Sequence, residues 1–203
     1  MPVLKLLHQY CPQAAVNYCY ALWQKDSFVL IIKKDRRSKL GDYRFIPGSS
    51  TPHQISINHT LNPYSFLITY IHEVAHLHTF TKYKRKVLPH GKEWKRNFHQ
   101  LMLPLLNEQI FPSDVLLPLQ LYMQNPKASS CSDMRLFKAL QTYSTSAKPL
   151  LMELSTGENF VLHGRIFQKG LTRRTRVLCT ERSTGKQYTI SAQAPVERMI
   201  NEG

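Results

Sequence analysis

The chain has 203 residues, of which 42% are hydrophobic and 20% are charged, and this composition excludes a largely disordered protein. The length is enough for one buried core with a small extension, and it falls short of two full domains. Because 27 Lys and Arg oppose 13 Asp and Glu, the net charge is +14 and the surface should attract polyanions. We therefore expect nucleic acid as a partner, although a basic protein that is merely soluble has the same composition.

No sequence feature favours a membrane or secreted location. The chain lacks a run of about 18 apolar residues, an amphipathic basic helix and a lipidation motif. Its N-terminal residues lack the apolar stretch and cleavage site of a secretory signal. Four scattered cysteines without a CxxC pair fit free thiols in a reducing compartment. We expect a cytoplasmic monomer that does not bind membranes.

Helical and extended patterns alternate in the first third of the chain. Residues 12–25 place apolar side chains at helical spacing and predict a helix. Up to three short strands are predicted from the apolar run at 27–34, from the segment 35–47 with its Gly41 turn, and from the alternating residues 53–58.

A longer helix is predicted to begin at Pro63. Asn62 is a residue type that caps free backbone N–H groups, and a proline in the next position lacks a donor that would otherwise be unpaired. We expect this helix to continue to about Thr81. It contains the sequence HEVAH at residues 72–76.

Helical patterns continue to about residue 143. After a basic connector at 82–89, apolar residues recur at helical spacing until Pro104, which bends or ends the helix. Between residues 113 and 143 we predict two further helical pieces, broken by Pro118 and by the linker-like residues 125–130.

From Leu150 onward the pattern is extended. Segments 160–167, 175–181 and 187–191 are typical of strands, and residues 183–186 are typical of a hairpin turn. The sequence therefore predicts an α+β protein, in which a mainly helical core with a small early sheet precedes a small basic β-rich region.

HEVAH carries the residues of a metal-dependent hydrolase. On a helix His72 and His76 project from one face, so both imidazoles can reach one zinc ion at about 2.0–2.1 Å. Glu73 is displaced by one residue, which brings its carboxylate beside the open side of the metal. There it can take a proton from a zinc-activated water that attacks a carbonyl, and pass it to the leaving nitrogen.

A catalytic zinc needs a third protein ligand and an open fourth position. The downstream candidates are His78, His90, His99 and His163. His78 lies two residues after His76, on nearly the opposite side of the helix. His90 lies in a turn at the start of the next helix, which can fold back on the first, and we rank it above His99.

Four segments between residues 36 and 98 are found together: RRSKLGDYR, ISINHTL, HEVAH and HGKEWK. In this order they resemble the SprT-like family of zinc metalloproteases. The resemblance implies a compact gluzincin-like metalloprotease core, one catalytic Zn²⁺ bound by His72, His76 and His90, and Glu73 as the catalytic acid and base. The better-studied members of the family cleave proteins attached to or bound on DNA, and this implies protein substrates with DNA as a partner.

The resemblance suggests three parts: a SprT-like metalloprotease core at 1–125, a linker and helix at 126–149, and a basic β-rich region at 150–203. Many members of the family continue into a zinc ribbon with paired cysteines, which this chain lacks. We therefore expect the C-terminal region to resemble a ribbon without its cysteines and without a second zinc.

Two basic segments are candidate nucleic-acid-binding surfaces. They contain Lys82, Lys84, Arg85 and Lys86 beside the expected active site, and Arg165, Lys169, Arg173, Arg174 and Arg176 in the C-terminal region. Such residues can neutralise phosphates without reading bases, and Phe167 among them could stack on an unpaired base. A solvated loop or hairpin face is the alternative for both segments.

Three functions remain open at this point. The first is a zinc endopeptidase that acts on DNA-bound or DNA-crosslinked proteins. The second is a non-proteolytic DNA-binding adaptor with a structural zinc, for which Glu73 would have no purpose because such sites are closed by four protein ligands. The third is a zinc hydrolase of small amides, which a narrow, closed pocket would favour.

Overall fold

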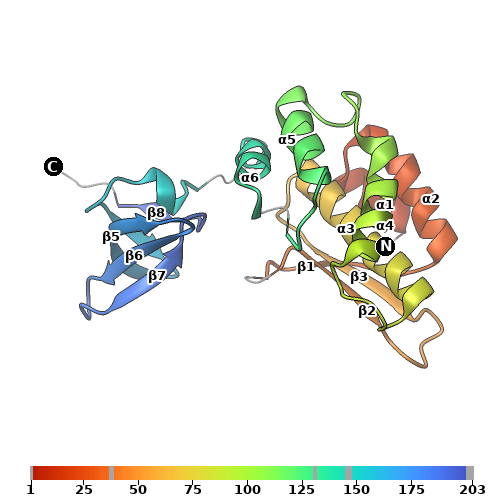
Figure 1. Cartoon of the computed structure of the whole chain (residues 1–203), viewed down its shortest axis with the longest axis horizontal. Helices are drawn as coiled ribbons and strands as arrows, with labels where there is room; N and C mark the ends of the chain where they lie inside the picture. Colours follow the sequence, from red (N-terminus) through yellow and green to blue (C-terminus); the bar gives the residue numbers. More distant parts are fainter. Residues whose placement is uncertain (1, 37–38, 130–131, 145–147, 200–203) are drawn as a thin grey trace. The chain divides into compact units, whose positions relative to one another are not determined.

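A computed structural model describes residues 2–36, 39–129, 132–144 and 148–199 (Figure 1). The chain divides into two compact units, Met1–Ser144 and Thr145–Gly203, and each is described by itself. The first unit combines helices with a small sheet, and the second is built around a β-sheet. The predicted α+β class with a C-terminal β region is therefore confirmed.

Six α-helices lie in the described part of the first unit. They are α1 (Val3–Tyr10), α2 (Val16–Asp26), α3 (Pro63–Tyr83), α4 (Lys92–Met102), α5 (Ser113–Met123) and α6 (Met134–Gln141). The helix predicted over 12–25 is α2 with a short 3-10 turn before it, whereas α1 was not predicted. Among the described residues, no helix has both the length and the apolar character needed to cross a bilayer.

The three predicted strands are present and form one sheet. β1 (Val29–Lys33), β2 (Gly41–Phe45) and β3 (His53–Asn58) are ordered β1-β3-β2, with β3 parallel to β1 and antiparallel to β2. β2 is therefore an edge strand, and it packs against α3. This arrangement places one strand edge beside the helix that carries HEVAH (Figure 1).

Helix α3 begins at Pro63 as predicted, and it ends two residues beyond the predicted end. Asn62 caps it, since its side-chain oxygen accepts a hydrogen bond from the Ser65 backbone N–H at 2.9 Å. Phe66, Tyr70 and Val74 are among the many fully buried side chains of this helix. Because α3 is surrounded by the core on most sides, its orientation is fixed, and the residues of HEVAH are held with it.

The prediction that Pro118 breaks a helix is wrong, because α5 continues through it. A proline at this position removes the N–H that would bond to the Asp114 carbonyl, but its fixed φ is helical. Val115 and Leu119 of α5 are fully buried, and their packing outweighs the loss of one bond.

Helix α6 belongs to the first unit. It lies within segment 126–149, which we predicted as a linker and helix between two larger parts, and it packs on α5. Leu136 and Leu140 are buried in the core of the first unit. The Asn62 side-chain amide also donates to the Leu140 carbonyl at 2.8 Å, which joins the end of α6 to the start of α3.

The second unit is an antiparallel sheet in the order β7-β6-β5-β4-β8. Its strands are β4 (Asn159–Leu162), β5 (Arg165–Arg173), β6 (Arg176–Glu181), β7 (Gln187–Ser191) and β8 (Glu197–Arg198), with a 3-10 turn at Leu151–Glu153. The sheet encloses its own small core, which consists of Leu151, Leu154, Phe160, Phe167, Val177, Cys179, Ala192 and Val196.

One predicted strand of the second unit is a hairpin. Segment 160–167 contains β4, a turn at His163 and Gly164, and the start of β5. Both turn residues have positive φ, 54° and 75°, which is the backbone that a tight hairpin requires. The predicted turn at 183–186 is confirmed, because it joins β6 to β7.

Candidate metal centre

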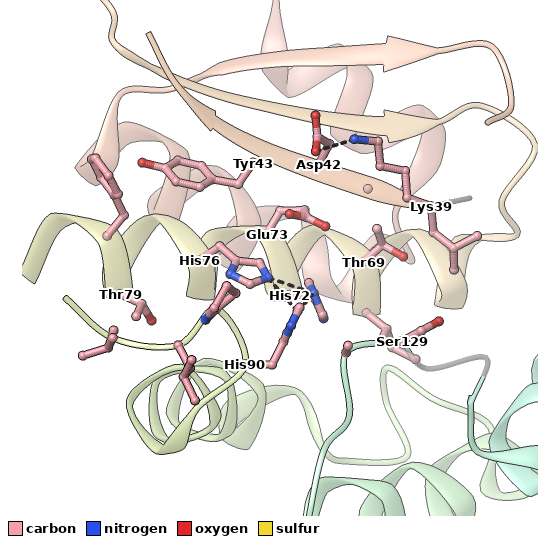
Figure 2. Close-up of a pocket in the computed structure, with 18 of the residues that line it drawn as sticks. Lys39, Asp42, Tyr43, Thr69, His72, Glu73, His76, Thr79, His90 and Ser129 are labelled. Atoms are coloured by element: carbon pink, nitrogen blue, oxygen red, sulfur yellow. Dashed lines mark hydrogen bonds and ion pairs between the residues drawn. The ribbon is translucent and has the colours of Figure 1, made fainter. Parts of the chain in front are cut away.

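Three histidines converge on one point. His72 and His76 lie one turn apart on α3, and His90 lies just before α4, which packs against α3. Their Nε2 atoms form a nearly equilateral triangle: 3.1 Å from His72 to His76, 3.0 Å from His76 to His90, and 3.3 Å from His90 to His72 (Figure 2). The predicted trio is therefore brought together.

This triangle fits a metal ion. Two ligand atoms at about 2.0–2.1 Å from a tetrahedral zinc lie about 3.3–3.4 Å apart, close to the distances between these nitrogens. Burial lowers the pKa of all three imidazoles, and it lowers the pKa of His76 to about 3. The rings are therefore neutral at pH 7 and have a lone pair for a metal. In the described part of the chain this is the one group of three or more His, Cys, Asp or Glu whose ligand atoms lie close enough to hold an ion.

Trp94 supports the three imidazoles from within the core. It is fully buried, and its ring centroid lies 4.6 Å from that of His72, 5.4 Å from that of His76 and 4.8 Å from that of His90. Phe98, one turn further along α4, stacks on Trp94 at 4.9 Å. The helical spacing predicted that both aromatics pack in the core, and the structure adds that Trp94 packs directly against the candidate ligands.

A hydrogen-bond chain also joins the two helices. The Asn97 side chain of α4 donates to the Thr79 hydroxyl of α3 at 2.8 Å, and that hydroxyl donates to the Ala75 carbonyl at 2.7 Å. Because His90 immediately precedes α4, every contact that fixes α4 on α3 also fixes the third imidazole relative to the other two.

Glu73 lies between the candidate metal centre and β2 (Figure 2). Its side chain is 5% exposed and accepts a hydrogen bond from the Tyr43 backbone N–H. Burial, together with the neighbouring Asp42 carboxylate, raises the pKa of Glu73 to about 8. A carboxyl group with a pKa near neutrality can both take up and release a proton during a reaction at pH 7.

Gly41 makes this position of Glu73 possible. A Cβ atom on Gly41 would lie 2.5 Å from Glu73 Oε1 and 2.6 Å from Thr69 Cγ2. The sequence predicts a turn at Gly41, but this prediction is wrong, because Gly41 is the first residue of β2. A glycine within a strand often marks a close approach of another group, and this signal could have identified it.

Replacing Gly41 by alanine should therefore disturb Glu73. We expect kcat of a reaction that uses the Glu73 carboxyl group to fall about 10- to 100-fold, because displacing a reacting group by about 1 Å has an effect of that size. Metal binding should be unchanged, since the atoms nearest to a Cβ on Gly41 belong to Glu73 and Thr69 and not to a candidate ligand. Steady-state kinetics and metal analysis of the purified variant measure both quantities.

Gly48→Ala is the control for this substitution. Gly48 has a φ of +79°, so alanine strains the backbone there, but its Cβ would meet no atom within 4 Å. This variant should lose some stability and retain wild-type kcat. A wild-type kcat in Gly41→Ala would show that the close approach of β2 to Glu73 has no role.

A cleft of about 590 Å³ contains the candidate centre. Its walls are β2 with the residues before it, one face of α3, the connector up to His90, and residues 128–129 (Figure 2). The lining includes Lys39, Asp42, Tyr43, Thr69, Phe80, Lys84, Arg85, Val87, Leu88 and Ser129. The Asp42 carboxylate is paired with Lys39 at 2.7 Å and with Arg44 at 2.6 Å.

None of the other histidine candidates belongs to the described group of convergent ligand atoms. His78 pairs with Asp26 at 2.7 Å, and His99 is exposed on α4. His163 lies in the turn between β4 and β5 of the second unit. The ranking of His90 above His99 therefore agrees with the geometry.

The basic connector is exposed as a nucleic-acid surface requires. Lys82, Lys84, Arg85 and Lys86 all face solvent, and two of them, Lys84 and Arg85, line the cleft. In the second unit, Arg173, Arg174 and Arg176 are exposed around the turn between β5 and β6.

Two residues of the predicted C-terminal surface are buried. Lys169 is 5% exposed and its ammonium group donates to the Met152 and Leu154 carbonyls, so it is not available to phosphate. Phe167 is 3% exposed and cannot stack on a base. Both predictions are wrong, because the two side chains point into the core of the second unit.

Arg165 is exposed but already paired. Its guanidinium forms an ion pair with the buried Glu181 carboxylate, and it lies 5.1 Å from the Phe167 ring centroid and 4.7 Å from that of Tyr188. It is therefore a weaker phosphate ligand than the three arginines of the hairpin.

The site thus has the features of a metal centre with a catalytic carboxyl group: three convergent neutral imidazoles, a buried Glu beside them and a cleft above them. Residues 12–110 match the family model of the SprT-like family. The match confirms the resemblance predicted from the sequence and includes every residue of the candidate centre. Neither the search of curated proteins nor that of solved structures found a match.

Proposed function

We propose that the protein is a zinc-dependent endopeptidase with a gluzincin-like core. The observation that supports this most directly is the convergence of His72, His76 and His90 in a cleft, with the Glu73 carboxyl group beside them. Zinc bound by the three Nε2 atoms would polarise a carbonyl and lower the pKa of a water molecule. Three neutral nitrogen donors are a usual set for such a catalytic ion.

The residues of the chain supply the remaining chemistry. In its ionised form Glu73 would take the proton of the attacking water and return it to the leaving nitrogen. The Tyr43 N–H holds the Glu73 carboxylate, and the short approach at Gly41 sets its position. Trp94 and Phe98 keep water from the rear of the imidazoles, because both are fully buried.

The strand β2 supports a peptide as the substrate. An edge strand has backbone N–H and C=O groups on one side that no other strand uses, and an extended peptide can pair with them. β2 borders the cleft and touches Glu73, so a peptide added to this edge would lie across the centre. A cleft bounded by a strand edge suits a chain better than a small amide.

The geometry favours this proposal over an adaptor with a structural zinc. Structural zinc sites are normally closed by four protein ligands. In the described part of the chain, the group at the centre consists of three histidines without a fourth His, Cys, Asp or Glu at ligand distance. An open fourth position and a buried Glu73 are both needed for hydrolysis, and neither is needed to hold a fold.

We further propose that DNA-bound or DNA-crosslinked proteins are the substrates. The net charge of +14 and the exposed cations of the connector support a polyanion near the cleft. Arg173, Arg174 and Arg176 offer a second cationic surface on the C-terminal unit. Phosphate contacts of this kind bind DNA without reading its sequence, which suits an enzyme that must act wherever a protein is attached.

The substitution of Arg173, Arg174 and Arg176 by Glu tests this part of the proposal. We expect the affinity for single-stranded DNA to fall at least 10-fold at low salt, and the logarithmic salt slope to become shallower by about 2–3. Cleavage of a DNA-bound basic protein should fall with it. Cleavage of a free peptide should be unchanged. A DNA-binding titration measures the affinity, and separate assays measure cleavage of the DNA-bound protein and of the free peptide.

The control exchanges two other exposed cations of the same unit, Arg182 and Lys186, for Glu. These residues lie at the turn between β6 and β7, at the opposite end of β6 from the β5–β6 turn. If both variants lost DNA affinity equally, the charge of the unit rather than the β5–β6 hairpin would be responsible.

A further inference from the structure

One end of the cleft is aromatic. Tyr43 on β2 and Phe80 on α3 both line it, with their ring centroids 5.9 Å apart. Phe80 follows His76 by four residues, so it lies one helical turn beyond the candidate ligand on the same face. Figure 2 shows Tyr43 toward the Thr79 end of α3, away from Lys39 and Ser129 at the opposite end.

Tyr43 and Phe80 form an aromatic wall that is held rigidly. The Tyr43 hydroxyl is hydrogen-bonded to His53 Nδ1 at 2.8 Å, and the two rings stack at 5.9 Å. Phe45 packs on Phe80 at 4.7 Å and on His53 at 5.5 Å. Rings fixed in this way lose little conformational entropy when another apolar group packs against them.

Cations accompany the aromatic rings. The Lys84 ammonium lies 5.5 Å from the Phe80 ring centroid, and both Lys84 and Arg85 line the cleft. An apolar side chain can pack beside them, whereas a lysine or arginine of a substrate would be repelled.

The position of Tyr43 on β2 relates this wall to the site of cleavage. Gly41 approaches Glu73, and Tyr43 follows it by two residues, so both point from the same face of the strand. Two residues of a strand span about 6.6–6.8 Å. This is also the distance between successive side chains on one face of a peptide that pairs with the strand. Antiparallel pairing is the slightly more stable arrangement, and in it the peptide advances toward its N-terminus as β2 advances from Gly41 to Phe45.

We propose that Tyr43 and Phe80 form a specificity subsite for a large apolar side chain, aromatic or Leu-like, on the N-terminal side of the peptide bond that is cut. The subsite deepens the proposed endopeptidase function and depends on it. It selects against lysine and arginine through Lys84 and Arg85. The protease would thereby choose unfolded or exposed apolar segments of a substrate protein over its basic, DNA-contacting segments.

The test uses the zinc-loaded full chain and a series of peptides that differ at one residue. That residue is Phe, Leu, Ala or Lys, placed in turn at each of three positions on either side of the cut bond. We expect one N-terminal position at which kcat/KM for Phe or Leu exceeds that for Ala about 10- to 100-fold, with Lys below Ala. Phe80→Ala should reduce this preference to about threefold, while the zinc content stays at one ion per chain.

Two further variants distinguish a subsite from a general loss of stability. Phe80→Trp fills the space instead of emptying it, so it should shift the preference from Phe toward Ala. Leu103→Ala truncates an exposed apolar residue that does not line the cleft, and it should leave the preference unchanged.

Three results would overturn the subsite. They are equal cleavage of all peptides by wild type, a preference confined to the C-terminal side of the cut bond, and a preference that both Phe80 variants retain. If zinc-loaded wild type cut none of the peptides and no unfolded protein, the endopeptidase proposal itself would fail and the subsite with it.

Discussion

Glu73→Gln should abolish peptide hydrolysis while leaving the metal centre intact. Glutamine has nearly the same shape, so it can still accept the Tyr43 N–H, but it cannot take up the proton of the attacking water. General acid–base catalysis contributes about 10²- to 10⁴-fold, and we expect kcat to fall within that range. Steady-state cleavage of an unfolded protein and metal analysis of the same sample measure the two expectations.

The matched control is Glu108→Gln, because Glu108 is an exposed acidic residue of the same domain. It should behave as wild type. If Glu73→Gln cleaved at the wild-type rate, a proton acceptor other than Glu73 would have to be sought. If Glu73→Gln also lost its zinc, its loss of activity would not test the role of Glu73 in proton transfer.

His90→Ala should abolish metal binding. It deletes one of three candidate ligands, and the remaining two, His72 and His76, come from a single helix. Losing a residue that only supports a ligand lowers zinc affinity about 10- to 100-fold, so losing a ligand should lower it further. We expect no stoichiometric zinc in the purified variant, a lower melting temperature, and no stabilisation on adding zinc.

His99→Ala is the control for this result. It removes an exposed histidine from α4, the helix that follows His90. It should bind zinc like wild type. Equal zinc content in His90→Ala and wild type would contradict the three-histidine centre and would favour a ligand set other than the one that the structure brings together.

The residues of the centre could be predicted because their signals are local. HEVAH places two imidazoles on one helical face by spacing alone, and the Asn62 and Pro63 pair marks the start of that helix. His90 required one further step, the expectation that the next helix folds back. Trp94 and its helical repeat made that step reasonable, because they indicate a buried face on α4.

The environment of Glu73 could not be predicted in the same way. It depends on contacts between β2 and α3, and the 17 residues between these two elements include the strand β3. No periodicity describes such a contact. Gly41 has the clearest role of this kind, since only the folded chain shows that its missing side chain makes room for Glu73. Tyr43 is similar, because its backbone N–H rather than its ring touches the carboxylate.

The C-terminal unit shows how charge can mislead. Its basic neighbours predict that Lys169 lies on a nucleic-acid-binding surface, but it lies two residues after Phe167 on the same strand. A period of two places both on one face, and that face is the core. The turn at His163 and Gly164 could not be predicted either, because a single His-Gly pair inside an apolar run does not interrupt the strand pattern.

Peptide hydrolysis by this protein, as we propose it, depends on a metal ion held by three histidines. The most direct measurement is cleavage of an unfolded protein by the full chain in three states: zinc-loaded, stripped with a chelator, and reloaded with one equivalent of zinc, each with and without single-stranded DNA. We predict cleavage at internal peptide bonds in the first state, none in the second and recovery in the third. Stoichiometric zinc binding without cleavage in any state, with DNA binding intact, would contradict the peptidase and identify a metal-stabilised DNA-binding adaptor instead.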